Sequence, residues 1–117
     1  MCDCVNVQMG SFDNSVLMGY YPVMRQYRDN RVAEGLSGDG IFIDRCLVDE
    51  VVALWKAGVR TYGQCCGHNL PGVRPMINIG YVDMEKALSL GYEVYLFTND
   101  PSRRDTIIPK SVTNKNL

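Results

Sequence analysis

Six residues in this chain carry the thiol and imidazole groups that bind zinc, and most of them occur close together. Cys2 and Cys4 are separated by one residue, and the only histidine closes the segment Cys65-Cys66-Gly67-His68. Zn²⁺ takes four such ligands in a tetrahedron, and neighbouring ligands lower the entropic cost of assembling them. The sequence therefore predicts a structural Zn²⁺ site with a Cys₃His set drawn from Cys2, Cys4, Cys46, Cys65, Cys66 and His68.

Each part of this ligand set also has an explanation without metal. Cys46 can be a small buried apolar residue on a helix, because free cysteine is among the most buried residue types. Cys2 and Cys4 can belong to a flexible, thiol-bearing terminus. Adjacent strand residues point to opposite faces, so Cys65 and Cys66 both reach one ion only if the strand has ended. The glycine that follows them would permit such a turn.

The composition favours a reducing compartment for these thiols. The chain has 117 residues, five cysteines, and 12 Lys and Arg against 13 Asp and Glu. An odd cysteine count cannot pair fully within one chain, and the sequence has neither a secretory leader nor an apolar run of membrane-spanning length. We therefore expect one cytoplasmic domain over residues 1–117, with no membrane segment, whose cysteines serve metal or thiol chemistry.

Hydrophobic periodicity predicts the elements that must position the cysteines. An apolar run behind Gly40 indicates a strand over residues 41–44, and the apolar spacing from Leu47 to Gly58 indicates a helix with Asp44 as its N-cap. A second, short helix is expected over residues 84–90, capped by Asp83. Further strands are expected at residues 15–20, 59–64, 76–80 and 92–97.

This order of elements predicts an α+β fold with a ferredoxin-like split βαβ core (β-α-β-β-α-β), an extra N-terminal strand and an irregular C-terminal tail. The first two core strands then run in the same direction, so Cys46 and residues 65–68 emerge at the same end of the sheet. Residues 25–39 are polar and end in glycines, which is typical of a mobile loop. Residues 98–117 contain two prolines and indicate a surface tail.

The cysteine motifs resemble a family of small uncharacterised proteins found in phages, prophages and Gram-positive bacteria. The resemblance rests on Met1-Cys2-Asp3-Cys4, Gly10-Ser11-Phe12-Asp13-Asn14, Ile43-Asp44-Arg45-Cys46-Leu47, Leu54-Trp55, Gly58-Val59-Arg60-Thr61, Cys65-Cys66-Gly67-His68-Asn69, Gly91-Tyr92-Glu93 and Pro109-Lys110. Gln64 stands where relatives usually have glycine, and Ser102-Arg103-Arg104-Asp105 replaces an acidic stretch. The resemblance implies a phage or bacterial cytoplasmic setting and a bound metal, but no particular activity.

The first functional hypothesis is a non-enzymatic accessory protein, stabilised by zinc, that binds a host protein or a small anionic or nucleotide ligand. A domain of this size gains from a structural metal, because zinc binding contributes directly to folding. The polar residues that could receive an anionic group near the cysteines are Arg45, Gln64, Asn69 and Arg74. Each of them also fits an ordinary solvated loop residue, and self-association of the chain stays open.

The second hypothesis is a hydrolase-like zinc enzyme or a cysteine-dependent enzyme. A catalytic zinc needs an open water position and a carboxylate base, for which Asp44, Asp49 and Glu50 are nearby. In the thiol variant, His68 would activate Cys65 or Cys66. No His-Glu signature accompanies the cysteines, however, and residues 49 and 50 fit the acidic charge favoured at a helix start.

The third hypothesis is a module that binds single-stranded nucleic acid. Ferredoxin-like sheets stack bases on exposed aromatic rings, and Tyr62, Tyr92 and Tyr95 lie on expected strands. The phosphate contacts would come from Arg25, Arg28, Arg31, Arg103 and Arg104. The formal net charge of -1 supplies no general attraction to nucleic acid, which makes it the least favoured partner.

Overall fold

The computed structural model describes residues 15–67 and 74–111, which form a mixed α+β fold. The strands are β1 (Ser15–Met18), β2 (Ile41–Asp44), β3 (Gly63–Cys65), β4 (Met76–Asn78) and β5 (Thr106–Ile107). The α-helices are α1 (Arg25–Ala33), α2 (Val48–Lys56) and α3 (Met84–Ser89), and the 3-10 turns η1 (Pro22–Met24) and η2 (Arg45–Leu47) precede the first two helices. Within these residues, no helix is long and apolar enough to cross a membrane.

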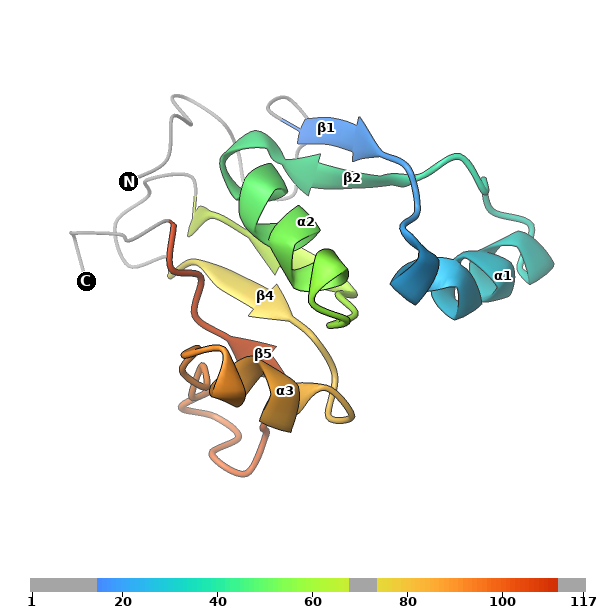
Figure 1. Cartoon of the computed structure of the whole chain (residues 1–117). Helices are drawn as coiled ribbons and strands as arrows, with labels where there is room; N and C mark the ends of the chain where they lie inside the picture. Colours follow the sequence, from blue (N-terminus) through green and yellow to red (C-terminus); the bar gives the residue numbers. More distant parts are fainter. Residues whose placement is uncertain (1–14, 68–73, 112–117) are drawn as a thin grey trace.

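The described strands pair as two antiparallel sheets. β1 pairs with β2 in a register that places Leu17 opposite Phe42, and β4 lies between β3 and β5 in the second sheet. Figure 1 shows α2 beside both sheets and α1 at the outer end of β1 and β2. The ferredoxin-like topology stays a prediction, because β2 pairs with β1 and not with a later strand of the described residues.

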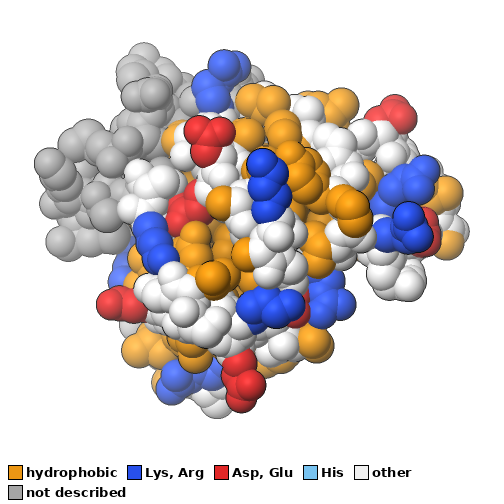
Figure 2. Space-filling model, viewed as in Figure 1, with side chains coloured by type: hydrophobic (Ala, Val, Ile, Leu, Met, Phe, Trp, Pro, Cys, Tyr) orange, Lys and Arg blue, Asp and Glu red, His pale blue; other side chains and the backbone are white. Residues whose placement is uncertain are grey.

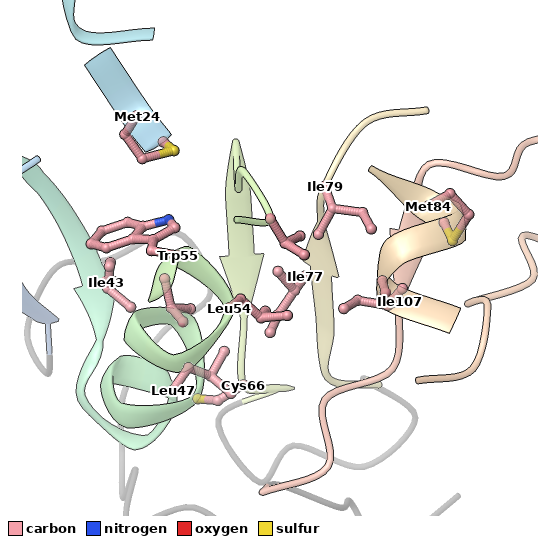
Figure 3. Packing of buried hydrophobic residues seen from close by; sticks show 13 residues of the cluster. Met24, Ile43, Leu47, Leu54, Trp55, Cys66, Ile77, Ile79, Met84 and Ile107 are labelled. Atoms are coloured by element: carbon pink, nitrogen blue, oxygen red, sulfur yellow. The ribbon is translucent and has the colours of Figure 1, made fainter. Parts of the chain in front are cut away.

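The core lies between α2 and the two sheets. Leu47, Val51, Leu54 and Trp55 are all buried, as the apolar spacing of the sequence predicts, and Gly58 ends the helical segment with a φ of 86°. Figure 3 shows Leu47, Leu54 and Trp55 in one cluster with Ile43 of β2, Ile77 of β4 and Ile107 of β5, and Cys66 beside Leu47. The indole Nε1 of Trp55 donates a buried hydrogen bond of 2.9 Å to the hydroxyl of Thr61.

Residues 25–39 are not a continuous loop, because α1 occupies Arg25–Ala33. This prediction is wrong for a physical reason: α1 has no buried residue and so lacks the apolar periodicity that marks a helix in a sequence. The helix contacts the rest of the protein through Tyr27, whose ring meets the rings of Tyr20 and Tyr62 at centroid distances of 6.3 and 5.5 Å.

The expected surface tail also contains a buried strand. Thr106 and Ile107 are fully buried in β5, at the edge of the second sheet, so the prediction of a surface tail from residue 98 onward is wrong at these positions. The expected strand at 92–97 is reduced to single bridges, from Val94 to Ile107 and from Phe97 to Asp100. Prolines and polar residues surround Thr106, which is why its pattern does not stand out in the sequence.

Candidate functional site

The ends of β2 and β3 are joined at the place where the cysteines lie. The carboxylate of Asp44, the last residue of β2, accepts a hydrogen bond of 3.0 Å from the backbone N–H of Cys66. The side chain of Gln64 donates to the carbonyl oxygen of Phe42 at 3.2 Å. These bonds bring the end of β2 and the segment after β3 together, although the two strands belong to different sheets.

Asp44 therefore has a different function from the one expected of it. It occupies the position just before η2, where a helix cap belongs, but its side chain makes no capping hydrogen bond. A carboxylate that is only 8% exposed needs a donor, and the N–H of Cys66 supplies one. Asp44 thus occupies the predicted cap position, but its side chain does not make the predicted capping hydrogen bond.

Cys65 and Cys66 have contrasting surroundings. Cys66 is 1% exposed and packs in the hydrophobic core next to Leu47 (Figure 3). Cys65 ends β3, is half-buried, and its Sγ accepts a hydrogen bond of 3.3 Å from the backbone N–H of Gly67. Gly67 has a φ of 80°, a conformation that favours glycine, and this turn directs its N–H back to the sulfur.

The other proposed ligands are distributed around this end of the fold. Cys46 lies in η2, is half-buried, and packs against the core. Cys2, Cys4 and His68 lie outside the described residues. Among residues 15–67 and 74–111, no group of three or more His, Cys, Asp or Glu side chains could hold a metal ion.

The four residues proposed to bind an anion have different neighbours. Arg45 is exposed in η2, and Asn69 lies outside the described residues. Gln64 contacts β2 through its bond to Phe42, whereas the guanidinium of Arg74 lies 5.0 Å from the centre of the Tyr95 ring. The described residues do not show a shared anion site made by this set.

Glu50 accepts hydrogen bonds from distant parts of the chain, which its position as an acidic residue at a helix start does not predict. Its carboxylate, on a residue that is 8% exposed, accepts hydrogen bonds from the Tyr92 hydroxyl at 2.8 Å and from the backbone N–H groups of Lys110 and Ser111 at 2.7 and 3.0 Å. The Ser111 hydroxyl donates to it at 2.5 Å. Burial of Tyr92 and its bond to Glu50 raise the pKa of this tyrosine far above its ordinary value. These donors are 42 to 61 residues away in sequence, so no local motif indicates them.

Arg60 and Asp83 form a second long-range connection. The Asp83 carboxylate accepts two guanidinium bonds from Arg60, at 2.8 and 2.9 Å, and one from its backbone N–H at 2.9 Å. These hydrogen bonds hold the pKa of Asp83 below its ordinary value. Asp83 was expected to cap α3, and it does precede that helix, but it makes no side-chain capping bond.

The aromatic and basic residues of the nucleic-acid hypothesis are only partly available on the surface. Tyr92 binds Glu50, and Arg103 pairs with Asp105 at 2.8 Å while lying over the Phe97 ring. Tyr62 remains 43% exposed. Figure 2 shows the basic side chains of α1, which are all arginines, apart from the hydrophobic side chains that gather over β1, β2 and α2.

Comparisons with known proteins provide no assignment for this site. The chain matches no protein-family model, no curated protein and no solved structure. The family resemblance inferred from the motifs stays a prediction.

Proposed function

We propose that the chain is a non-enzymatic binding protein of a phage or bacterial cytoplasm, stabilised by a structural Zn²⁺ ion at the joined ends of β2 and β3. Cys65 and Cys46 would supply thiolates from the described residues, and His68 with one of Cys2 and Cys4 would complete the Cys₃His set. Cys66 would remain a core residue. This function includes binding a host protein or a small anionic ligand, and it does not depend on the ferredoxin-like topology.

The observation that carries the proposal is the hydrogen bond from Gly67 N–H to Cys65 Sγ. A metal-bound cysteine is a thiolate, and a hydrogen bond donated to a charged sulfur favours that charged form. Cys65 is half-buried, whereas Cys66 is 1% exposed and packs in the hydrophobic core. The adjacent thiols thus fit two different roles.

The carboxylates near the cysteines favour a structural over a catalytic metal. Asp44 holds the backbone of Cys66, and Glu50 accepts four hydrogen bonds from the C-terminal segment and Tyr92. A general base needs a carboxylate that can reach a water or a substrate proton. Asp44 and Glu50, two of the three expected bases, instead accept hydrogen bonds from other parts of the fold, which weakens the hydrolase-like alternative.

Native mass spectrometry of the full chain, purified without added metal or chelator, tests the zinc site. We expect one Zn²⁺ per chain in the wild type, loss of that ion in Cys65→Ala, and its retention in the matched control Cys66→Ala. Because Cys66 is a core residue, its substitution should lower the free energy of unfolding by about 1–2 kcal/mol without releasing metal.

Two results would contradict the proposal. One is a wild-type protein that carries no metal and whose five thiols are alkylated together in the folded state. The other is the reverse pattern of the two variants, in which Cys66→Ala releases zinc and Cys65→Ala retains it.

A further inference from the structure

A groove of about 440 Å³ lies between α1, the β1–β2 sheet and β3. This volume falls within the range of small-molecule sites. Three parts of the chain that are distant in sequence form it, so its shape depends on the tertiary structure. Its main lining side chains are Leu17, Tyr27, Arg31, Phe42, Tyr62 and Gln64.

The floor of the groove is apolar and partly exposed. Leu17 and Phe42 face each other across β1 and β2 and are 51% and 50% exposed, whereas the next residue, Ile43, is fully buried on the other face. An aromatic and an aliphatic side chain held next to each other in a concavity offer a flat surface to a planar ring. About half of each side chain therefore faces solvent where the two residues line the groove.

Tyr62 forms a fixed wall beside this floor. Its ring and the Tyr27 ring pack at an interplanar angle of 74° with a centroid distance of 5.5 Å, and Gly80 lies against it. A Cβ atom at Gly80, whose φ is +72°, would lie 3.0 Å from the Tyr62 ring. The absence of that atom allows the ring to rest on the chain, so Tyr62 is positioned before any ligand arrives.

Arg31 brings a positive charge to the same groove. Its guanidinium lies 5.6 Å from the centre of the Tyr27 ring, and its Nη1 donates a long hydrogen bond of 3.5 Å to the Tyr27 hydroxyl. Its Nε is buried without a hydrogen-bond partner, and no acidic group within residues 15–67 and 74–111 forms an ion pair with it. An anionic group of a ligand in the groove would provide the counter-charge that Arg31 lacks among these residues.

The remaining polar groups narrow the class of ligand. Asp39 also lines the groove, so the lining carries one positive and one negative formal charge and does not suit a polyanion. The Gln64 amide nitrogen donates to Phe42, which leaves the amide oxygen as an acceptor. The Asp39 carboxylate and the Gln64 amide oxygen can accept hydrogen bonds from the amino group of a nucleobase, and the apolar floor suits its ring. The single guanidinium of Arg31 matches a single phosphate.

We propose that this groove binds a nucleoside monophosphate unit, with the base against Phe42 and Tyr62 and the phosphate at Arg31. The inference rests on the binding role in the proposed function and names its ligand class. The unit can come from a free nucleotide or from a single strand of nucleic acid, since both present the same base and phosphate.

Titration of the zinc-loaded full chain with AMP, followed by NMR, tests the site. We expect shifts of the Phe42 and Tyr62 ring signals, with adenosine and inorganic phosphate each binding at least 10-fold more weakly than AMP. UMP, whose base has no amino group, should also bind more weakly. The buried indole N–H of Trp55 should not shift, and it reports that each variant is folded.

Paired variants separate the groove from general surface effects. Phe42→Ala and Arg31→Gln should each weaken AMP binding at least 10-fold. Leu96→Ala, at a side chain that is 54% exposed outside the groove, and Arg104→Gln should leave it unchanged. The proposal is overturned if AMP causes no shift at millimolar concentration, or if folded Phe42→Ala and Arg31→Gln bind it as the wild type does.

Two further measurements distinguish the sources and the proposals. A six-nucleotide adenylate strand that binds more tightly than AMP, with affinity falling as salt rises, assigns the unit to nucleic acid. Equal or weaker binding of that strand assigns it to free nucleotide. If the chain binds AMP but holds no zinc, the zinc-site proposal fails and the groove proposal stands. If it holds zinc but does not bind AMP, only the groove proposal fails.

Discussion

Residues 15–42 and residues 74–111 use their charged side chains in opposite ways. In the later region, Asp83 is bound by Arg60, Asp105 pairs with Arg103, and Lys110 donates to the Leu90 carbonyl oxygen. In the earlier region, Arg28 lies 3.9 Å from Asp29 with both side chains at least half exposed. Exposed pairs of this kind contribute little to stability. The charged side chains of the later region thus bind partners within the fold, whereas the Arg28–Asp29 pair of the earlier region remains exposed to solvent.

Among the charged residues compared here, replacing Glu50 should give the largest loss of stability. Glu50→Ala removes the acceptor of four hydrogen bonds and leaves the N–H groups of Lys110 and Ser111 without it, so we expect the free energy of unfolding to fall by about 3 kcal/mol. Urea unfolding measures this difference. Asp49→Ala, at the exposed neighbour, is the control and should stay within about 0.5 kcal/mol of the wild type. Equal effects of the two variants would contradict the role of Glu50.

The pair of Arg60 and Asp83 should have a smaller effect that depends on pH. Since Arg60 is 34% exposed and partly screened by solvent, we expect Asp83→Asn to cost about 1–2 kcal/mol at pH 7. The folded-state pKa of Asp83 is lowered, so its stabilisation is complete above its unfolded pKa, near 4, and is lost as the pH falls through the lower folded value.

Unfolding of Asp83→Asn and the wild type across pH 7 to 2.5 checks this sign. The difference between them should shrink below about pH 4. Asp105 contributes part of the remaining acid dependence: burial raises its pKa, but bonds from Arg103 and Thr106 outweigh this and lower it. Glu85→Gln, at an exposed residue of α3, serves as control. A difference that grows toward low pH would contradict the assignment.

The smallest stability effect should come from the exposed face of β2. Phe42→Ala should lower the free energy of unfolding by less than about 1 kcal/mol, because half of the ring is already exposed. Ile43→Ala, one residue away on the buried face, should cost about 2–4 kcal/mol. Thermal or urea unfolding compares the two. Similar losses would show that Phe42 belongs to the core and would remove the contrast between the two regions.

Local patterns in the sequence predict much of the fold. The apolar spacing from Leu47 to Trp55 identifies α2, and the cap positions of Asp44 and Asp83 locate two helix starts. The same reasoning misses α1, since that helix buries no residue, and misassigns both aspartates, since their carboxylates bind Cys66 and Arg60 across 22 and 23 residues. A capping pattern carries no information about a competing donor that folding brings nearby.

The cysteine segment shows the same division. The sequence by itself indicated that two cysteines and a glycine turn lie at the end of one strand, and that Cys46 follows another, because these depend only on residue order and periodicity. Only the tertiary structure decided that Cys66 enters the core beside Leu47 while Cys65 stays at the rim and accepts the Gly67 N–H. Alternation along a strand separates two neighbours, but packing against α2 determines which of them is buried.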